Sequence, residues 1–102
     1  MRKLFHPETN EIRLTTVLDA LSDQIRIQIV REIAKIGEQS CGNVNIPIPK
    51  STLSHHYKVL RESGITYTRV EGTQRFNSLR TDDLNKRFPG LLDAILQAAE
   101  PI

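Results

Sequence analysis

The sequence predicts a mainly α-helical fold with one small β-hairpin, and three stretches of the chain support this prediction. In "SDQIRIQIVREIAKIG", Ile25, Ile29, Ile33 and Ile36 form an apolar stripe at helical spacing. The stretch "PKSTLSHHYKVLRESG" also repeats apolar residues at helical steps. The runs "ITYTRV" and "QRFNSL" are separated by "EGT" with Gly72, which predicts two strands joined by a tight turn.

The length and composition place limits on the class of protein. The chain has 102 residues, so we expect residues 1–102 to form a single domain. With 38% hydrophobic residues and no tryptophan, its core must be small, and burial in a dimer interface would add to it. Cys41 is the only cysteine, which excludes a disulfide framework within the chain. With no long apolar run, the chain is expected to be soluble, cytoplasmic and without membrane contact.

Before residue 50 the sequence predicts an arm, two helices and a loop. Residues 1–10 are expected to form an arm or loop, and residues 11–21 a first helix. The second helix has a cap at Ser22 or Asp23 and a stop at Gly37. Prolines and glycine in residues 38–49 make a long helix there unfavourable. We expect a loop with at most one helical turn, whose inward side chains are Val44, Ile46 and Ile48.

The helix predicted over residues 50–63 has two different sides. Leu53, Tyr57 and Leu60 are expected to face the core, because they recur at helical steps. The opposite side carries hydroxyls, an imidazole and an ammonium, and no acidic residue occurs between positions 50 and 61. A solvated helix face usually mixes charges of both signs. This side is therefore more typical of contact with a polyanion than of solvation alone.

After this helix, the sequence predicts a hairpin over residues 65–80 and a broken C-terminal helix. Thr81 is expected to cap the first part of that helix. A break is predicted near Phe88, with Pro89 opening the second part. The helix over residues 89–99 is too apolar for the surface of a monomer, which favours its use in a dimer interface.

The order of helix, turn, helix and hairpin is typical of a DNA-binding unit with a wing. A helix that enters the major groove needs short polar side chains near the bases and cations near the phosphates. A flanking Arg26 could be a solvated charge or a phosphate contact. The residues expected to bind DNA are Lys50, Ser51, Thr52, Ser54, His55, Lys58, Arg61, Arg69 and Arg75.

Three of these stretches are similar to segments of one known family. "LSDQIRIQIVREI", "STLSHHYKVLRESGI" and "TRVEGTQRFNSL" resemble the opening helix, the recognition helix and the wing of ArsR-type bacterial repressors. The resemblance covers about residues 16–80 and implies a homodimeric winged helix-turn-helix regulator. Such a regulator binds operator DNA and releases it when an effector arrives. In that family the terminal helices form the dimer, which here implies residues 11–21 and 89–99.

The sequence departs from this family at its metal sites. The paired cysteines of the soft-metal sensors are replaced by Cys41 alone, and "LLDAILQAAE" lacks the histidines of the zinc sensors. Adjacent His55 and His56 point about 100° apart on a helix, so they do not chelate one ion well. We therefore expect no metal and no cofactor, with Cys41 as a small buried residue. An atypical metal site that involves Cys41 remains an alternative.

Two other function classes compete with DNA binding. Catalysis is disfavoured, because Ser54 and His55 project from a convex helix and no third group or glycine-rich phosphate loop accompanies them. The chain is therefore expected not to be an enzyme. A protein-interaction module that uses the apolar C-terminal helix is the stronger alternative.

Overall fold

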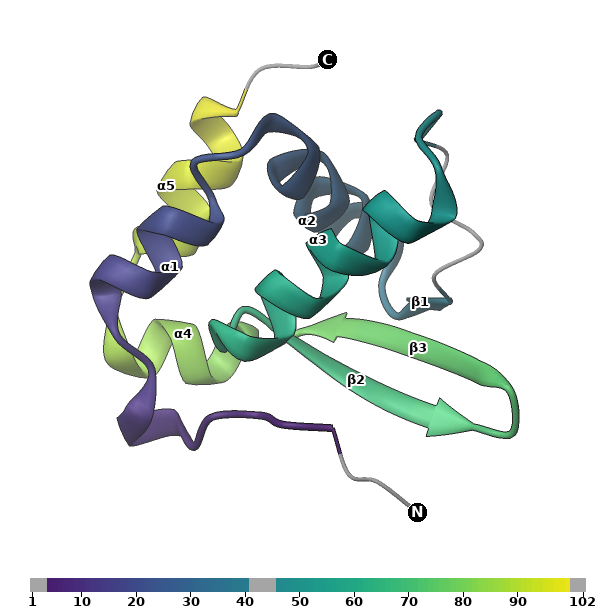
Figure 1. The fold of residues 1–102 in the computed structure, drawn as a ribbon. Coiled ribbons are helices and arrows are strands. Elements are labelled where there is room, and N and C mark those ends of the chain that lie inside the picture. Colours follow the sequence, from purple (N-terminus) through teal and green to yellow (C-terminus); the bar gives the residue numbers. More distant parts are fainter. Residues whose placement is uncertain (1–3, 41–45, 100–102) are drawn as a thin grey trace.

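The computed structural model describes residues 4–40 and 46–99, which form five α-helices, one 3-10 helix and a small antiparallel sheet. The helices are α1 (Leu14–Ala20), α2 (Gln24–Ile36), α3 (Lys50–Glu62), α4 (Thr81–Arg87) and α5 (Leu91–Ala98), and the 3-10 helix is η1 (Thr9–Glu11). The strands are β1 (Gln39–Ser40), β2 (Thr66–Glu71) and β3 (Gln74–Leu79). In Figure 1, α1, α4 and α5 lie together on one side, and the β2–β3 hairpin projects on the other.

Helix α2 begins and ends where the sequence predicts. The Asp23 carboxylate caps it by accepting the backbone N–H groups of Ile25 at 2.8 Å and Arg26 at 3.1 Å. Gly37 ends it with a φ of 97°, in the left-handed region. One expectation for its apolar stripe was wrong: Ile36 is 65% exposed. Ile36 is the last residue of the helix, where the chain leaves the core for β1.

The first helix is shorter than the predicted residues 11–21. Residues Thr9–Glu11 form η1, Ile12 has an extended backbone, and α1 begins only at Leu14. Ile12 is 1% exposed, and its side chain covers Gly64 at the end of α3. The extended backbone at Ile12 therefore separates η1 from α1. The Ile12 side chain packs over Gly64.

The sheet has the strand order β1-β3-β2, so β3 is central and β2 is an edge. Gln39 and Thr68 both pair with Asn77, one from each side. The hairpin was predicted, but β1 was not. A strand of two residues is too short to show an alternating pattern in the sequence. Residues 46–49 contain no helix, and Ile46 and Ile48 pack partly against the core as expected. Val44 lies outside the described residues.

The C-terminal helix breaks at Phe88, as predicted. The second part begins at Leu91 rather than at Pro89, because Gly90 precedes it with a φ of 81°. Thr81 is the first residue of α4 and not its cap, which is the position of Arg80. Val17, Leu84 and Leu92 are buried where α1, α4 and α5 meet. None of the helices within residues 4–40 and 46–99 has the length and apolar character needed to cross a lipid bilayer.

Candidate nucleic-acid interface

The outer side of α3, defined by Lys50, Ser51, Thr52, Ser54, His55 and Lys58, is the candidate interface. All six side chains are exposed. Within residues 4–40 and 46–99, no carboxylate pairs with Lys50 or Lys58. The helix starts after Pro49 without a side-chain cap, and the side chains of Lys50 and Ser51 are both exposed. The structure therefore brings these six predicted residues onto one exposed surface.

The inner side of α3 fixes the helix to the body of the protein. Tyr57 and Leu60 are 4% and 0% exposed, and Leu53 lies in the same core, all as predicted. Burial of a large apolar side chain contributes about 1.5–3 kcal/mol to folding. The inner side therefore holds α3 firmly enough that its outer side keeps one orientation.

A polar network that includes His56 also ties α3 to α2. The Arg26 guanidinium donates from Nε to the Ala20 carbonyl at 2.5 Å and from Nη1 to Nδ1 of His56 at 3.2 Å. Because arginine only donates, Nδ1 of His56 must accept, which places the ring proton on Nε2. His56 is 8% exposed, and its partner Arg26 lies on the neighbouring helix α2. The guanidinium of Arg26 is therefore engaged in hydrogen bonds within the protein.

Asp23 completes this network at the start of α2. Its carboxylate oxygen lies 4.0 Å from Nδ1 of His56. Partial burial opposes the charged form, but hydrogen bonds from the helix start and the charge of Arg26 outweigh it and lower the pKa of Asp23. The ionised carboxylate therefore caps α2 and faces the buried side of α3 at the same time.

The hairpin arginines differ in their availability. Arg69 donates to Glu38 with an Nη2–Oε1 distance of 3.0 Å, and it also pairs with Glu71. Its guanidinium lies over the Phe76 ring, 4.6 Å from the ring centre. The hydrogen bonds that Arg69 donates to Glu38 and then to Glu71 raise the pKa of Arg69 above its usual value. Arg75 is exposed and forms no ion pair with a described residue.

The expectation that Arg61 contacts a phosphate has to be revised. Arg61 is 7% exposed and lies on the inner side of α3. A DNA backbone cannot reach a side chain that the protein covers to this extent. The spacing in the sequence suggested otherwise, because Arg61 follows Lys58 by three residues. Residues three apart on a helix usually lie on the same face.

The sequence also did not reveal which residues pair with the charged side chains near the interface. Glu71 follows Arg69 by two residues on β2, so both side chains lie on one face of the strand, and this spacing was a usable signal. Glu38 and Arg26 gave no such signal, since their partners are distant in sequence. Across residues 4–40 and 46–99, no group of three or more His, Cys, Asp or Glu side chains could hold a metal ion. Cys41 lies outside the described residues.

Comparison with known proteins decides the family. No protein-family model matches the chain. The uncharacterized HTH-type transcriptional regulator YceK of Bacillus subtilis (strain 168) is 39% identical over 82 residues, which cover 78% of this chain and 82% of that protein. The chain belongs to the HTH-type transcriptional regulators. A second member, the uncharacterized HTH-type transcriptional regulator MJ1325 of Methanocaldococcus jannaschii, is 30% identical over 81 residues, or 78% of this chain and 90% of that protein.

The fold of this HTH-type regulator is consistent with a winged helix-turn-helix. Helices α2 and α3 pack against each other, and the β2–β3 hairpin follows α3 directly. Residues 38–49 were expected to form a loop with at most one helical turn. Residues 38–40 and 46–49 contain none, and the remaining five positions lie outside the described residues.

Proposed function

We propose that this HTH-type regulator binds duplex DNA through the outer side of α3, with the β2–β3 hairpin as its wing. The observation that carries the proposal is the exposed, acid-free outer side of a helix whose inner side is buried. The names of both relatives support a role in transcription regulation. Helix α3 is 13 residues long, and an α-helix of this kind fits the major groove, which is about 12 Å wide.

Each side chain of the outer side of α3 has a role that follows from its chemistry. Lys50 and Lys58 neutralise phosphates and fix the register of the helix. The short hydroxyl side chains and the His55 imidazole approach base edges, where they donate and accept hydrogen bonds. Arg75 reaches the DNA backbone or the minor groove from the hairpin. Arg69 has its charge already neutralised and positions the hairpin instead.

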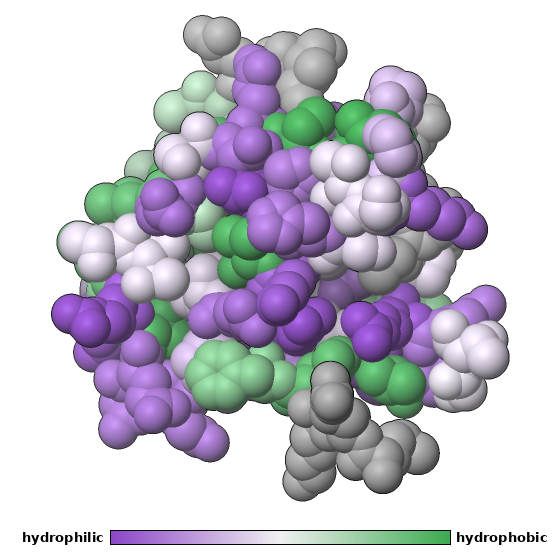
Figure 2. Space-filling model, in the orientation of Figure 1, coloured by the Kyte–Doolittle hydropathy of each residue, from purple (hydrophilic) through white to green (hydrophobic). Residues whose placement is uncertain are grey.

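We further propose an ArsR-type homodimer that forms through α1 and α5 and represses transcription. Leu14 and Leu18 on α1 are 44% and 45% exposed, and Ile95 and Leu96 on α5 are only partly buried. In Figure 2, hydrophobic residues show among hydrophilic ones at the upper left, where α1 and α5 lie in Figure 1. Two copies would place two α3 helices about 34 Å apart on a near-palindromic operator. Bound there, the dimer would block transcription.

The salt dependence of DNA binding tests the proposed interface. Fluorescence anisotropy with a labelled duplex from the region upstream of the protein's own gene gives the affinity at several salt concentrations. Lys58→Ala should weaken binding to every sequence and reduce the slope of log K against log salt by about one. Lys86→Ala is the matched control, because Lys86 is exposed on α4, which is not part of the proposed interface, and the slope should stay unchanged. An unchanged slope in Lys58→Ala would remove Lys58 from the phosphate contacts.

Analytical ultracentrifugation of Leu18→Glu tests the proposed dimer. A charge at this exposed position on α1 should give monomers, since desolvation of a carboxylate in an apolar interface is costly. Leu92 is a poorer probe, because it is 4% exposed within one protomer and a charge there would damage the fold itself. A Leu18→Glu protein that still sediments as a dimer would place the interface elsewhere. If the wild type ignores DNA at low salt, the interaction-module alternative gains support.

A further inference from the structure

The N-terminal arm, residues 4–8, lies along the outer edge of the hairpin. The strand order β1-β3-β2 leaves one side of β2 without a neighbouring strand. In Figure 1 the arm runs beside β2 on that open side. An edge strand exposes backbone N–H and C=O groups that lack a partner in the sheet. The arm therefore occupies the place where a further strand would otherwise add.

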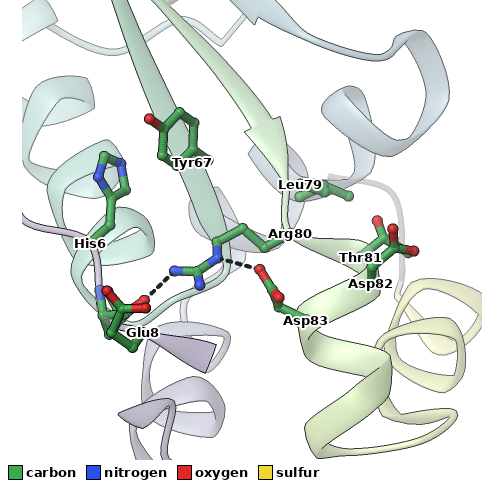
Figure 3. A pocket seen from close by; sticks show the side chains of 9 residues that line it. His6, Glu8, Tyr67, Leu79, Arg80, Thr81, Asp82 and Asp83 are labelled. Atoms are coloured by element: carbon green, nitrogen blue, oxygen red, sulfur yellow. Dashed lines mark hydrogen bonds and ion pairs between the residues drawn. The ribbon is translucent and has the colours of Figure 1, made fainter. Parts of the chain in front are cut away.

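A single histidine makes the contact between the arm and this edge. The Thr68 backbone N–H donates to Nε2 of His6 at 3.0 Å. The His6 ring also stacks on Tyr67, with ring centres 4.3 Å apart and an interplanar angle of 22° (Figure 3). On the opposite side of Thr68, its hydroxyl donates to Oδ1 of Asn77 at 2.7 Å. Because Nε2 accepts a hydrogen bond, this contact exists only while Nε2 carries no proton.

The next residues of the arm are held by bonds that do not depend on His6. Arg80 donates from Nη1 to the Pro7 carbonyl at 2.7 Å and from Nε to Oδ2 of Asp83 at 3.0 Å (Figure 3). The Thr9 hydroxyl donates to Oδ1 of Asp83 at 2.7 Å. Residues 7–9 are thus fixed to the start of α4. Loss of the His6 contact would free the outer end of the arm without detaching its base.

Burial and the charges of two arginines oppose the protonation of His6. A cavity of about 510 Å³ borders the ring. The charged and titratable groups that surround it are Arg61 from α3, Arg80 before α4, Tyr67 on β2, Glu8 on the arm, and Asp82 and Asp83 on α4. Burial, followed by the charges of Arg61 and Arg80, lowers the pKa of His6 below its ordinary value of 6.5, and a hydrogen bond at the Leu4 backbone only partly offsets this.

The direction of the pH effect follows from this lowered pKa. Above pH 6.5 the imidazole is neutral whether the arm is bound or free, so the contact contributes fully. As the pH falls below 6.5, the free arm takes up a proton before the bound arm does, and the contact is progressively lost. Acid therefore favours the released arm.

We propose that the arm is a pH-sensitive latch on the hairpin, in which neutral His6 holds the edge of β2 at Thr68 and protonated His6 lets it go. The latch positions the hairpin relative to α4 and α3. Its consequence for DNA rests on the proposed function, because the hairpin serves there as the wing. Release in mild acid then lowers the affinity of the regulator for its operator.

Amide hydrogen exchange at Thr68, measured by NMR at pH 7.5 and pH 5.5, tests the latch without DNA. In the wild type, the protection of Thr68 should fall by about fivefold at the lower pH, the equivalent of one lost hydrogen bond. The Ile65 amide, which donates to the Leu60 carbonyl at 3.1 Å, serves as the internal reference and should not change. His55→Gln is the matched control, since it removes an exposed imidazole on α3, and it should behave as the wild type.

Two variants at His6 separate its roles. His6→Gln keeps a hydrogen-bond acceptor that does not titrate, so Thr68 should stay protected at both pH values. His6→Phe keeps the stacking on Tyr67 but accepts no hydrogen bond, so Thr68 should be weakly protected at both. Equal Thr68 protection at the two pH values in the wild type, or the same acid-dependent drop in His6→Gln, would overturn the latch.

The DNA experiment distinguishes the latch from the proposed function. At each pH, the affinity of His6→Gln for the upstream duplex is compared with that of the wild type, so that pH effects common to both proteins cancel. The two should agree at pH 7.5, and His6→Gln should bind more tightly at pH 5.5, by up to about fivefold. Equal affinities at pH 5.5 would show that the latch does not act on the wing. If neither protein binds DNA, the proposed function fails, while Thr68 exchange still decides the latch.

Discussion

The outer side of α3 and the β2–β3 hairpin both carry basic side chains, but the protein treats these charges differently. Lys50 and Lys58 on α3 are exposed and have no carboxylate partner within residues 4–40 and 46–99. Arg69 on the hairpin is held by Glu38 and Glu71 and lies over an aromatic ring. Lys50 and Lys58 therefore keep charges that no described carboxylate neutralises, whereas the charge of Arg69 stabilises the hairpin.

This difference shows that a count of basic residues does not give the charge available to a polyanion. A phosphate that approaches Arg69 must compete with two carboxylates that are already in place. The same phosphate at Lys58 replaces only water and counterions. The proposed interface therefore depends more on α3 than on the hairpin, although both contain basic residues in the sequence.

The largest expected effect concerns the junction between the two regions, at Gly64. A Cβ atom at Gly64 would lie 2.6 Å from Cγ1 of Ile12, and the backbone φ of 91° is unfavourable for any L side chain. Gly64→Ala should lower the free energy of unfolding by about 2–5 kcal/mol, from strain and overpacking together. Urea unfolding followed by circular dichroism measures this.

Gly72 at the tip of the hairpin is the matched control for this change. Its φ is 62°, but an added Cβ would have no atom within 4 Å. Gly72→Ala should cost only about 1 kcal/mol, because backbone strain acts there alone. Equal losses at the two glycines would mean that the contact with Ile12 adds nothing to the cost at Gly64.

An intermediate effect is expected on the sequence preference of α3. Ser54→Ala and His55→Ala should each lower the preference for the operator over random DNA by about 1–3 kcal/mol, if these side chains read bases. Competition assays with specific and random duplexes measure this preference. Thr73→Ala, at an exposed position in the hairpin turn, is a suitable control and should leave it unchanged. Equal weakening on both duplexes would assign Ser54 or His55 to the DNA backbone instead.

The smallest effect would come from freeing the charge of Arg69. The double change Glu38→Gln and Glu71→Gln removes both carboxylate partners, so Arg69 becomes available to a phosphate. The slope of log K against log salt should then steepen by about one. Adding Arg69→Gln to this double variant should cancel the gain. A slope that does not change would show that the hairpin lies too far from the DNA for Arg69 to matter.

Much of the fold could be predicted from local patterns. Helix α2 carries its cap, its apolar stripe and its glycine stop within one continuous stretch. The apolar repeat of α3 and the two strands of the hairpin also lie in continuous stretches, although α3 has no side-chain cap. The two predictions of secondary structure that failed have specific causes. Strand β1 has two residues and exists only because β3 offers it a partner. The predicted helix over residues 11–21 starts late, because Ile12 packs over Gly64, which is 52 positions further along the chain.

The sequence by itself determined the helical and strand periods, and with them which side of α3 faces outward. These periods depend on residues that lie only a few positions apart in the chain, because backbone geometry fixes the spacing between them. Only the tertiary structure decided which charges remain free. The covering of Arg61, the pairing of Glu38 with Arg69 and the contact of His6 with Thr68 join residues that are distant in the chain, and their distances depend on how the elements pack.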